Sequence, residues 1–301
     1  MNRVAAFVLA YFIPLAANAV EPATLDSKIR PIAEAHKGKV AVAVKNLETG
    51  EEYSLHGDEV MPTASLIKLA VMVETYWQAK EGKVKLTTPL TLKKEDKVPG
   101  SGILTNHFSD GATFPLRDAI HLMIVFSDNT ATNMVLDQIG LPSTNARMEK
   151  LGLNHTKINA KVFRGDTRLD QEFGKKYGLG STTPREMVRL LEWIEAGKVV
   201  TPEACKEMLG HLKANDDKDK MTRFLPGGTI VAHKTGSVDA SKTDAGIIYV
   251  PDSKNKKKTH PIAVCVMTTD NEDKRWVVNN AAQITIGKIG RAVYDYFAEK
   301  K

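Results

Sequence analysis

The sequence has few of the features that define specialised protein classes. Its 301 residues include only two cysteines and 6% aromatic residues, and its formal net charge is only +6. Two cysteines cannot build a disulfide scaffold, and a chain of this length buries enough surface to fold without one. The small positive excess is spread along the chain, which argues against a nucleic-acid-binding surface. The composition is that of an ordinary globular protein and indicates no activity.

Long hydrophobic runs are also missing, except at the N-terminus. Arg3 precedes an apolar run of fourteen residues, 4–17, whereas about 20 are needed to cross a bilayer. Residues 17–19 then show the small-x-small pattern of a signal-peptidase site. We therefore predict a signal peptide over residues 1–19, a periplasmic or secreted protein, and no membrane span after the signal is removed. A buried N-terminal helix is the alternative.

The cysteines and histidines show no catalytic or metal-binding spacing. Cys205 and Cys265 could pair in an oxidising compartment, but free buried cysteines behave as small hydrophobic residues, which we favour for both. His107, His155 and His233 have no partners at metal-ligand spacing, so we expect structural histidines. The sequence thus predicts neither a metal nor an organic cofactor.

Strand-like segments occur near both ends of the chain, and helical patterns lie between them. Residues 40–44 and 51–55, joined by a turn with Asn and Gly, predict a hairpin. The order predicts an α/β unit from residues 20–61 and 207–301, with an all-helical region inserted at about 62–206. Further helices are expected at 65–77, 116–126, 130–139, 143–151, 183–196 and 277–297, and further strands at 229–234, 245–250 and 261–268.

Ser65 and Lys68 stand three residues apart at the start of the first of these helices. That spacing puts both on one helix face, so the amine can approach the hydroxyl. The lysine can take the serine proton only if burial or nearby positive charge lowers its pKa. Backbone N–H groups at the helix start would also lie near a developing oxyanion. A capping serine followed by a solvent-facing lysine is the alternative.

Ser127, Asp128 and Asn129 form a second motif between two apolar helical segments. In a functional site, Ser127 would pass a proton to a leaving nitrogen and Asn129 would offer its amide to substrate and to Lys68. Asp128 would be structural. All three residues are also strong helix-capping residues, so an N-cap is the alternative.

A third motif, Lys234, Thr235, Gly236 and Ser237, ends a predicted strand. The lysine supplies a positive charge, the two hydroxyls can bind a carboxylate, and the glycine lets a ligand approach the strand closely. An ordinary strand exit is the alternative.

Together and in this order, the three motifs resemble the S-x-x-K, S-D-N and K-T-G set of class A β-lactamases and penicillin-binding proteins. Their spacing, and a loop at residues 99–104, look closest to class A. The resemblance covers essentially the whole mature chain, residues 20–301. It implies the β-lactamase/transpeptidase-like α/β fold, in which an antiparallel sheet is flanked by helices and joined to an all-helical lobe.

The resemblance also implies a mechanism. Ser65 would form the acyl-enzyme, Lys68 would serve as a base and Ser127 would relay the proton to the leaving nitrogen. The N–H groups of Ser65 and Ser237 would form the oxyanion hole, and Lys242 would supplement the substrate-carboxylate contacts. The residues implied to bind substrate are Asn129, Lys234, Thr235, Gly236 and Ser237.

The sequence departs from class A enzymes in the omega loop, whose pattern is R-x-E-P-x-L-N. The best register here begins at Arg164 and places Asp166 where that pattern has the glutamate that activates water. Aspartate is one methylene shorter, so it reaches that water only if the loop moves inward. Glu172 is a second candidate base. Surface charge is the alternative for Glu172 and for Asp170.

Acylation is therefore better supported than deacylation. The sequence predicts an exported, monomeric serine β-lactamase that opens a small β-lactam through acyl-Ser65. The first alternative is a penicillin-binding peptidase that acts on the D-Ala-D-Ala ends of peptidoglycan peptides. The second is a β-lactam-acylated binding protein without turnover.

Overall fold

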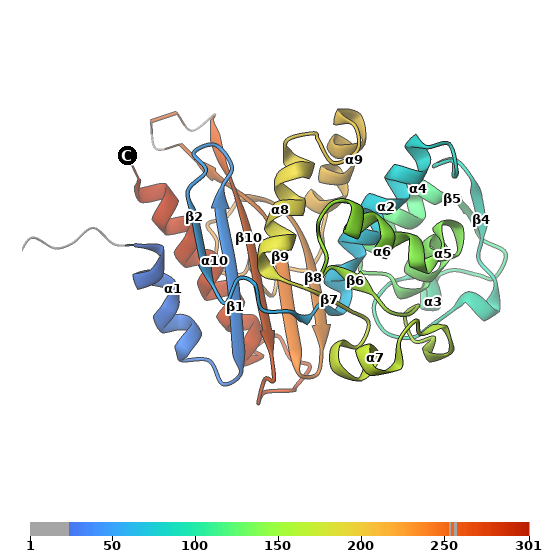
Figure 1. Ribbon diagram of the computed structural model, residues 1–301, viewed down its shortest axis with the longest axis horizontal. Coiled ribbons are helices and arrows are strands. Elements are labelled where there is room, and N and C mark those ends of the chain that lie inside the picture. The colour runs from blue at the N-terminus through green and yellow to red at the C-terminus, as the bar shows by residue number, and fades with distance from the viewer. Residues whose placement is uncertain (1–23, 253, 256–257, 301) are drawn as a thin grey trace, which may run out of the picture.

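A computed structural model describes residues 24–252, 254–255 and 258–300 (Figure 1). The predicted signal peptide, residues 1–19, lies outside these ranges. Among the helices of the described chain, none is both long enough and apolar enough to span a membrane.

A five-stranded antiparallel sheet combines early and late strands, as the sequence predicts. Its order is β2-β1-β10-β9-β8, so the early hairpin pairs directly with the last strand. The strands are β1 (Lys39–Asn46), β2 (Glu52–Leu55), β8 (Ile230–Val238), β9 (Ser241–Pro251) and β10 (Thr259–Thr269).

Ten α-helices lie within the described residues, most of them in the predicted helical region. They are α1 (Leu25–Glu34), α2 (Lys68–Lys80), α3 (Leu104–His107), α4 (Leu116–Val125), α5 (Asn129–Ile139), α6 (Leu141–Lys150), α7 (Gln171–Tyr177), α8 (Pro184–Glu195), α9 (Pro202–Lys213) and α10 (Ala281–Glu299). Helices α8 and α9 begin with a threonine cap followed by proline. Thr183 and Thr201 each accept a backbone N–H three residues later, and proline fits the first helical position because no hydrogen bond is lost there.

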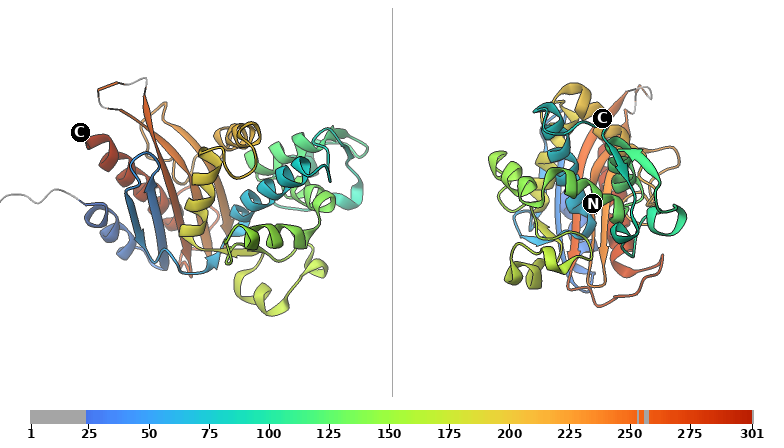
Figure 2. Two further views of the ribbon diagram at one scale, coloured as in Figure 1. Left: turned by 45° about the horizontal axis from the view of Figure 1, so that its top comes forward. Right: turned by 90° about the vertical axis from the view of Figure 1, so that its right-hand side faces the viewer.

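Helices cover both faces of the sheet (Figure 2). Helices α1 and α10 pack on one face, while α8 and α9 pack on the other. Successive strand residues therefore enter different cores: Val42 and Ile248 face α1 and α10, and Ala43 and Ile247 face the helical lobe. Because both faces are buried, β1 and β10 carry continuous apolar runs, at residues 40–44 and 262–267.

Helix α2 runs through the centre of the helical lobe, surrounded by α4, α5, α6 and α9. Its residues are buried nearly throughout its length, which agrees with an apolar pattern too broad for a single stripe. Two small sheets were not predicted. They join β3 (Met61–Pro62), β7 (Gly180–Thr182) and β6 (Lys157–Ile158), and β4 (Pro89–Thr91) with β5 (Thr113–Pro115).

The closing helix begins later than predicted, at Ala281 rather than at residue 277. The preceding loop is held by Asn280, whose side chain caps α10 and also donates to the carbonyl oxygens of Asp273 and Arg275. An asparagine that satisfies both the helix start and the loop stops the helix from extending backwards.

Candidate active site

Ser65 lies in a short 3-10 turn, Ala64–Ile67, that leads into α2. The turn begins under strain, because Ala64 has a φ of 47°, which non-glycine residues rarely adopt. Strand β8 passes directly beside this turn: a Cβ on Gly236 would lie 2.4 Å from the carbonyl oxygen of Thr63. Glycine at this position lets β8 lie against the turn that carries Ser65.

Lys68, the first residue of α2, is completely buried. Its Nζ donates to the carbonyl oxygen of Ser127 at 2.7 Å and to Asn129 Oδ1 at 2.9 Å. Burial lowers the pKa of Lys68 well below its usual value, the Lys234 ammonium lowers it further, and the Asp128 carboxylate opposes this. A lysine whose neutral form is favoured has the lone pair that a base requires.

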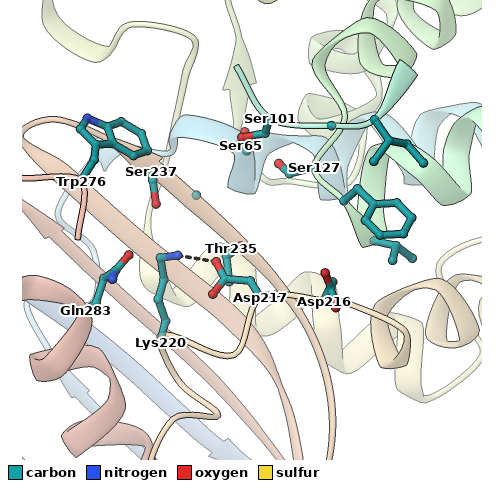
Figure 3. Close-up of a pocket in the computed structure, with 15 residues that line it drawn as sticks. Ser65, Ser101, Ser127, Asp216, Asp217, Lys220, Thr235, Ser237, Trp276 and Gln283 are labelled. Carbon is teal, nitrogen blue, oxygen red and sulfur yellow. Dashed lines mark hydrogen bonds and ion pairs between the residues drawn. The ribbon is translucent and has the colours of Figure 1, made fainter. Parts of the chain in front are cut away.

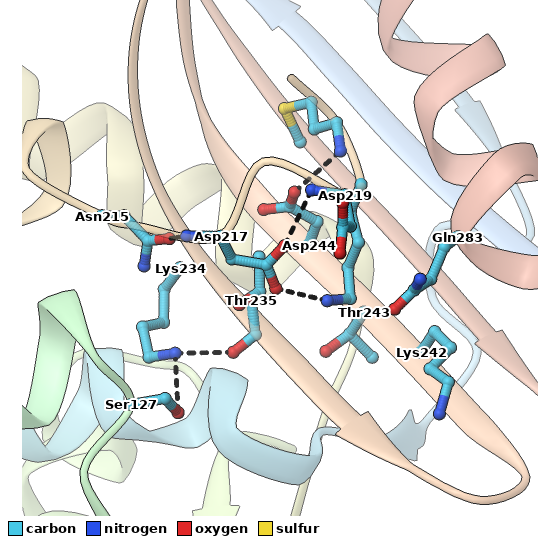
Figure 4. A network of polar contacts seen from close by, with 12 residues as sticks. Ser127, Asn215, Asp217, Asp219, Lys234, Thr235, Lys242, Thr243, Asp244 and Gln283 are labelled. Carbon is cyan, nitrogen blue, oxygen red and sulfur yellow. Dashed lines mark hydrogen bonds and ion pairs between the residues drawn. The ribbon is translucent and has the colours of Figure 1, made fainter. Parts of the chain in front are cut away.

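Ser127 connects the two parts of the site through its hydroxyl. Its Oγ lies 3.3 Å from the Nζ of Lys68. The same Oγ lies 3.1 Å from the Nζ of Lys234 (Figure 4). The backbone of Ser127 has a φ of 53°, an uncommon conformation that costs free energy and tends to occur at functional sites. A hydroxyl between two amines is well placed to pass a proton between neighbouring groups.

Asp128 fixes this segment against the loop at residues 99–104. One carboxylate oxygen caps α5 by accepting the N–H of Ala131. The other accepts the N–H groups of Ile103 at 2.7 Å and Leu104 at 2.9 Å. A Cβ on Gly102 would lie 2.3 Å from this carboxylate, so glycine is needed where the loop packs on Asp128.

Lys234 is also completely buried and projects from β8 toward Ser127. Its Nζ donates to the carbonyl oxygen of Thr235 at 2.7 Å. Burial lowers the pKa of Lys234 to about 7, although the carboxylates of Asp217 and Asp244 raise it. The amine is therefore close to its titration midpoint at neutral pH.

A cavity of about 360 Å³ opens above these groups (Figure 3). Of the residues expected from the sequence, it is lined by Ser65, Ser127, Thr235, Gly236 and Ser237, whereas Lys68, Asn129 and Lys234 are buried next to it. The structure thus brings the three motifs to one place. The cavity is also lined by Ser101, from the loop at residues 99–104. Polar or aromatic lining residues that sequence reasoning missed are Phe126, Asp216, Asp217, Lys220, Trp276 and Gln283.

Asp217 and Lys220 form an ion pair at the base of the cavity. The ammonium of Lys220, and hydrogen bonds from the Asp219 N–H and the Thr235 side chain, hold the pKa of Asp217 at about 2 despite its burial. In the sequence, residues 216–220 are a run of mixed acidic and basic residues, which looks like a solvated turn. Only the packing of that turn under β8 reveals its place in the site.

A second buried pair of polar side chains links β8 to β9. The Nδ1 of His233 lies 3.0 Å from the Asp244 carboxylate on β9, and both side chains are almost fully buried. Asp244 also accepts the N–H of Met221. His233 therefore has the structural role expected from the sequence. Among the described residues no group of three His, Cys, Asp or Glu side chains is arranged to hold a metal ion.

The structure does not bring the two expected bases to this cavity. Asp166 is exposed and lines a different hollow together with Arg164 and Lys161. Glu172 is 81% exposed and pairs with Lys175 on the surface of α7. Asp170 caps α7 by accepting the N–H of Phe173.

Another part of the same loop lies against the site helix. The side chain of Asn133 on α5 binds both the N–H and the carbonyl oxygen of Val162, at 2.8 and 3.0 Å. Val162 is only 8% exposed, whereas Phe163 is 64% exposed. Asn133 follows Asn129 by one helical turn, and the loop residue that it holds, Val162, is buried and apolar. Main-chain binding of this kind leaves no sequence signal, which explains why Val162 was missed.

Comparisons with known proteins show the family to which the chain is similar. A family model described as the Beta-lactamase enzyme family matches residues 24–297. A β-lactamase of Proteus vulgaris is 24% identical over 275 residues, which cover 89% of this chain and 88% of the relative. The CARB-4 β-lactamase of Pseudomonas aeruginosa is 23% identical over 264 residues, covering 87% of this chain and 86% of the relative.

Solved structures show the same similarity. The β-lactamase from Sphaerobacter thermophilus has a TM-score of 0.78 and 28% identity, covering 92% of this chain and 99% of its own. A structure of PBP-A has the same TM-score with 25% identity, covering 92% of this chain and 96% of its own. The chain is thus similar over almost its full described length both to β-lactamases and to PBP-A.

Proposed function

Because the chain belongs to the β-lactamase enzyme family, within the class A serine superfamily, we propose that it opens the β-lactam amide through an acyl-enzyme on Ser65. In the first step Lys68 takes the proton of the Ser65 hydroxyl and the serine oxygen attacks the carbonyl carbon. The C–N bond then breaks, and Ser127 passes a proton to the leaving nitrogen. The observation that carries this proposal is the Ser127 hydroxyl, which lies within 3.3 Å of two buried lysines.

The remaining residues of the site would bind the substrate. The N–H groups of Ser65 and Ser237 would stabilise the oxyanion. Lys234, Thr235 and Ser237 would hold the substrate carboxylate, and the Asn129 amide would bind the substrate next to Lys68. Export to the periplasm or medium forms part of the proposal, since a β-lactam or a peptidoglycan peptide is met outside the cytoplasm.

The first test is hydrolysis of the chromogenic cephalosporin nitrocefin by the mature protein. We expect a burst of colour equal to the protein concentration, followed by slow turnover. The burst should disappear in Ser65→Ala, while a serine outside the cavity, such as Ser143, should tolerate the same change. A full burst from Ser65→Ala would show that another nucleophile is used.

A second candidate function follows from the loop that carries Asp166. Without a carboxylate from this loop in the cavity, acylation would proceed but the water needed for deacylation would lack a base. That behaviour suits a penicillin-binding peptidase, which acts on D-Ala-D-Ala peptides and is blocked by β-lactams. Because the acyl group must still leave Ser65, the D-Ala-D-Ala peptide is supplied together with glycine, whose amine takes the acyl group in place of water. Release of D-alanine under these conditions, at a rate above that of nitrocefin turnover, would favour this candidate.

The exposed positions of Asp166 and Glu172 give a direct prediction. Asp166→Asn and Glu172→Gln, made separately, should each leave the decay of the acyl-enzyme within about two-fold of the wild-type rate, because surface changes away from a site have small effects. The measurement is the loss of the adduct with time by intact mass spectrometry. A ten-fold slower decay in either variant would assign the base to that residue.

The pKa of Lys234 predicts how acylation depends on pH. Lys234 is protonated below about 7, and only the charged form attracts a substrate carboxylate. The second-order rate constant of acylation by an anionic β-lactam should therefore fall as the pH rises through about 7. Lys234→Arg, which stays charged, should move this fall to higher pH. A wild-type profile that is flat between pH 6 and 9 would contradict this assignment.

A further inference from the structure

An exposed indole stands at one end of the cavity. Trp276 lines the cavity together with Ser65 and Ser237, yet 66% of its surface is exposed. Figure 3 places it beside Ser237, at the opposite end from Asp216. Tryptophan usually gains stability from being buried, so its exposure here leaves a large apolar surface open next to the reacting serine.

Two contacts fix the orientation of this indole. Its Nε1 donates to Asp239 Oδ1 at 2.6 Å. The Nζ of Lys242 lies 4.2 Å from the ring centroid and donates to the carbonyl oxygen of Val238 at 2.8 Å. A cation over one face is attracted to the ring, so Lys242 covers that face and leaves the other free.

The backbone that carries Trp276 is also held firmly. The fully buried Asn280 donates to the carbonyl oxygens of Asp273 and Arg275, and Gln283 donates to that of Val277. The indole is thus fixed before any ligand binds. A fixed side chain loses little entropy on binding, which favours affinity.

We propose that the free face of Trp276 stacks on a planar aromatic substituent that a β-lactam carries next to its carboxylate. This inference rests on the proposed function, which puts that carboxylate on Thr235 and Ser237. Because Trp276 adjoins Ser237, a ring on the carbon next to the one bearing the carboxylate extends toward the indole. Aromatic pairs contribute about 0.5–1.5 kcal/mol beyond burial, which corresponds to a change of about 2- to 12-fold in affinity.

The test compares two cephalosporins with the same 2-thienylacetamido side chain. Nitrocefin has a planar dinitrostyryl group beside the carboxylate-bearing carbon, and cephalothin has a small acetoxymethyl group there. Trp276→Leu should lower the second-order rate constant of acylation by nitrocefin about 3- to 10-fold and that by cephalothin less than two-fold. Trp276→Phe should retain most of the preference. The control is Val278→Ala, an exposed position on the same loop, which should change neither rate.

The possible results distinguish failure of the stacking inference from failure of the proposed function. If the wild-type protein is acylated by both drugs but Trp276→Leu slows both equally or neither, the stacking inference is wrong and the proposed function stands. If the wild-type protein is acylated by neither drug, the proposed function fails and the inference fails with it. Thermal unfolding of each variant distinguishes loss of stacking from loss of folding.

Discussion

Lys68→Met should lower the rate of acylation by a β-lactam by about 10²- to 10⁴-fold, the range contributed by a well-placed general base. Lys68 is completely buried, its pKa is lowered, and its Nζ contacts Ser127 and Asn129. Methionine keeps an unbranched side chain in the same space but has no amine to take the proton of Ser65. Acylation is followed by stopped-flow absorbance with nitrocefin and by intact mass.

The matched control is Lys80→Met, at the exposed end of the same helix. It removes one positive charge from α2 without touching the cavity, so the acylation rate should stay within about two-fold. Equal loss in both variants would point to helix stability rather than to a base. An unchanged rate in Lys68→Met, with the variant folded, would remove Lys68 from the mechanism.

Val162→Glu should accelerate deacylation, by about 10²-fold if the new carboxylate activates water as a general base. Asn133 holds the main chain of Val162 against α5, one helical turn from Asn129. Four residues of helix rise about 6 Å, so a glutamate side chain from position 162 can extend toward Lys68. The measurement is steady-state turnover of nitrocefin, together with the lifetime of the adduct.

Val162→Gln provides the control for this change, since it has almost the same shape but no carboxylate. Only the glutamate variant should shorten the lifetime of the acyl-enzyme. If both variants behave like the wild type, position 162 does not face the acylated serine. If both accelerate turnover equally, a change in loop position rather than a new base is responsible.

The motifs could be found from sequence because each occupies a few consecutive residues in one element. Ser65 and Lys68 lie in the turn before α2 and at its first residue, and Lys234 to Ser237 lie near the end of β8, so local spacing predicts their geometry. The sheet could be predicted too, because apolar strands at both chain ends bracket a helical region. The helix that begins after the Thr183 cap was predicted to within one residue at each end.

Parts of the site that depend on loop packing could not be predicted. Lys220 and Trp276 come from segments whose charge or exposure looks ordinary in sequence, and tertiary contacts bring them to the cavity. The register predicted for the loop around Asp166 was wrong for a related reason. Its register was taken from side-chain identity, whereas in the fold it is set by Asn133, which binds the main chain of Val162 and so carries no information about that side chain.

The most direct test of the account is the mass of the mature protein after mixing with benzylpenicillin. We expect one adduct per chain, located on the peptide that contains Ser65. This adduct should persist after free drug is removed, because the loop around Asp166 supplies no carboxylate to the cavity. An adduct on a different residue, or no covalent change at all, would contradict the acyl-Ser65 mechanism. Rapid hydrolysis without accumulation of the adduct would contradict the claim that deacylation is slow.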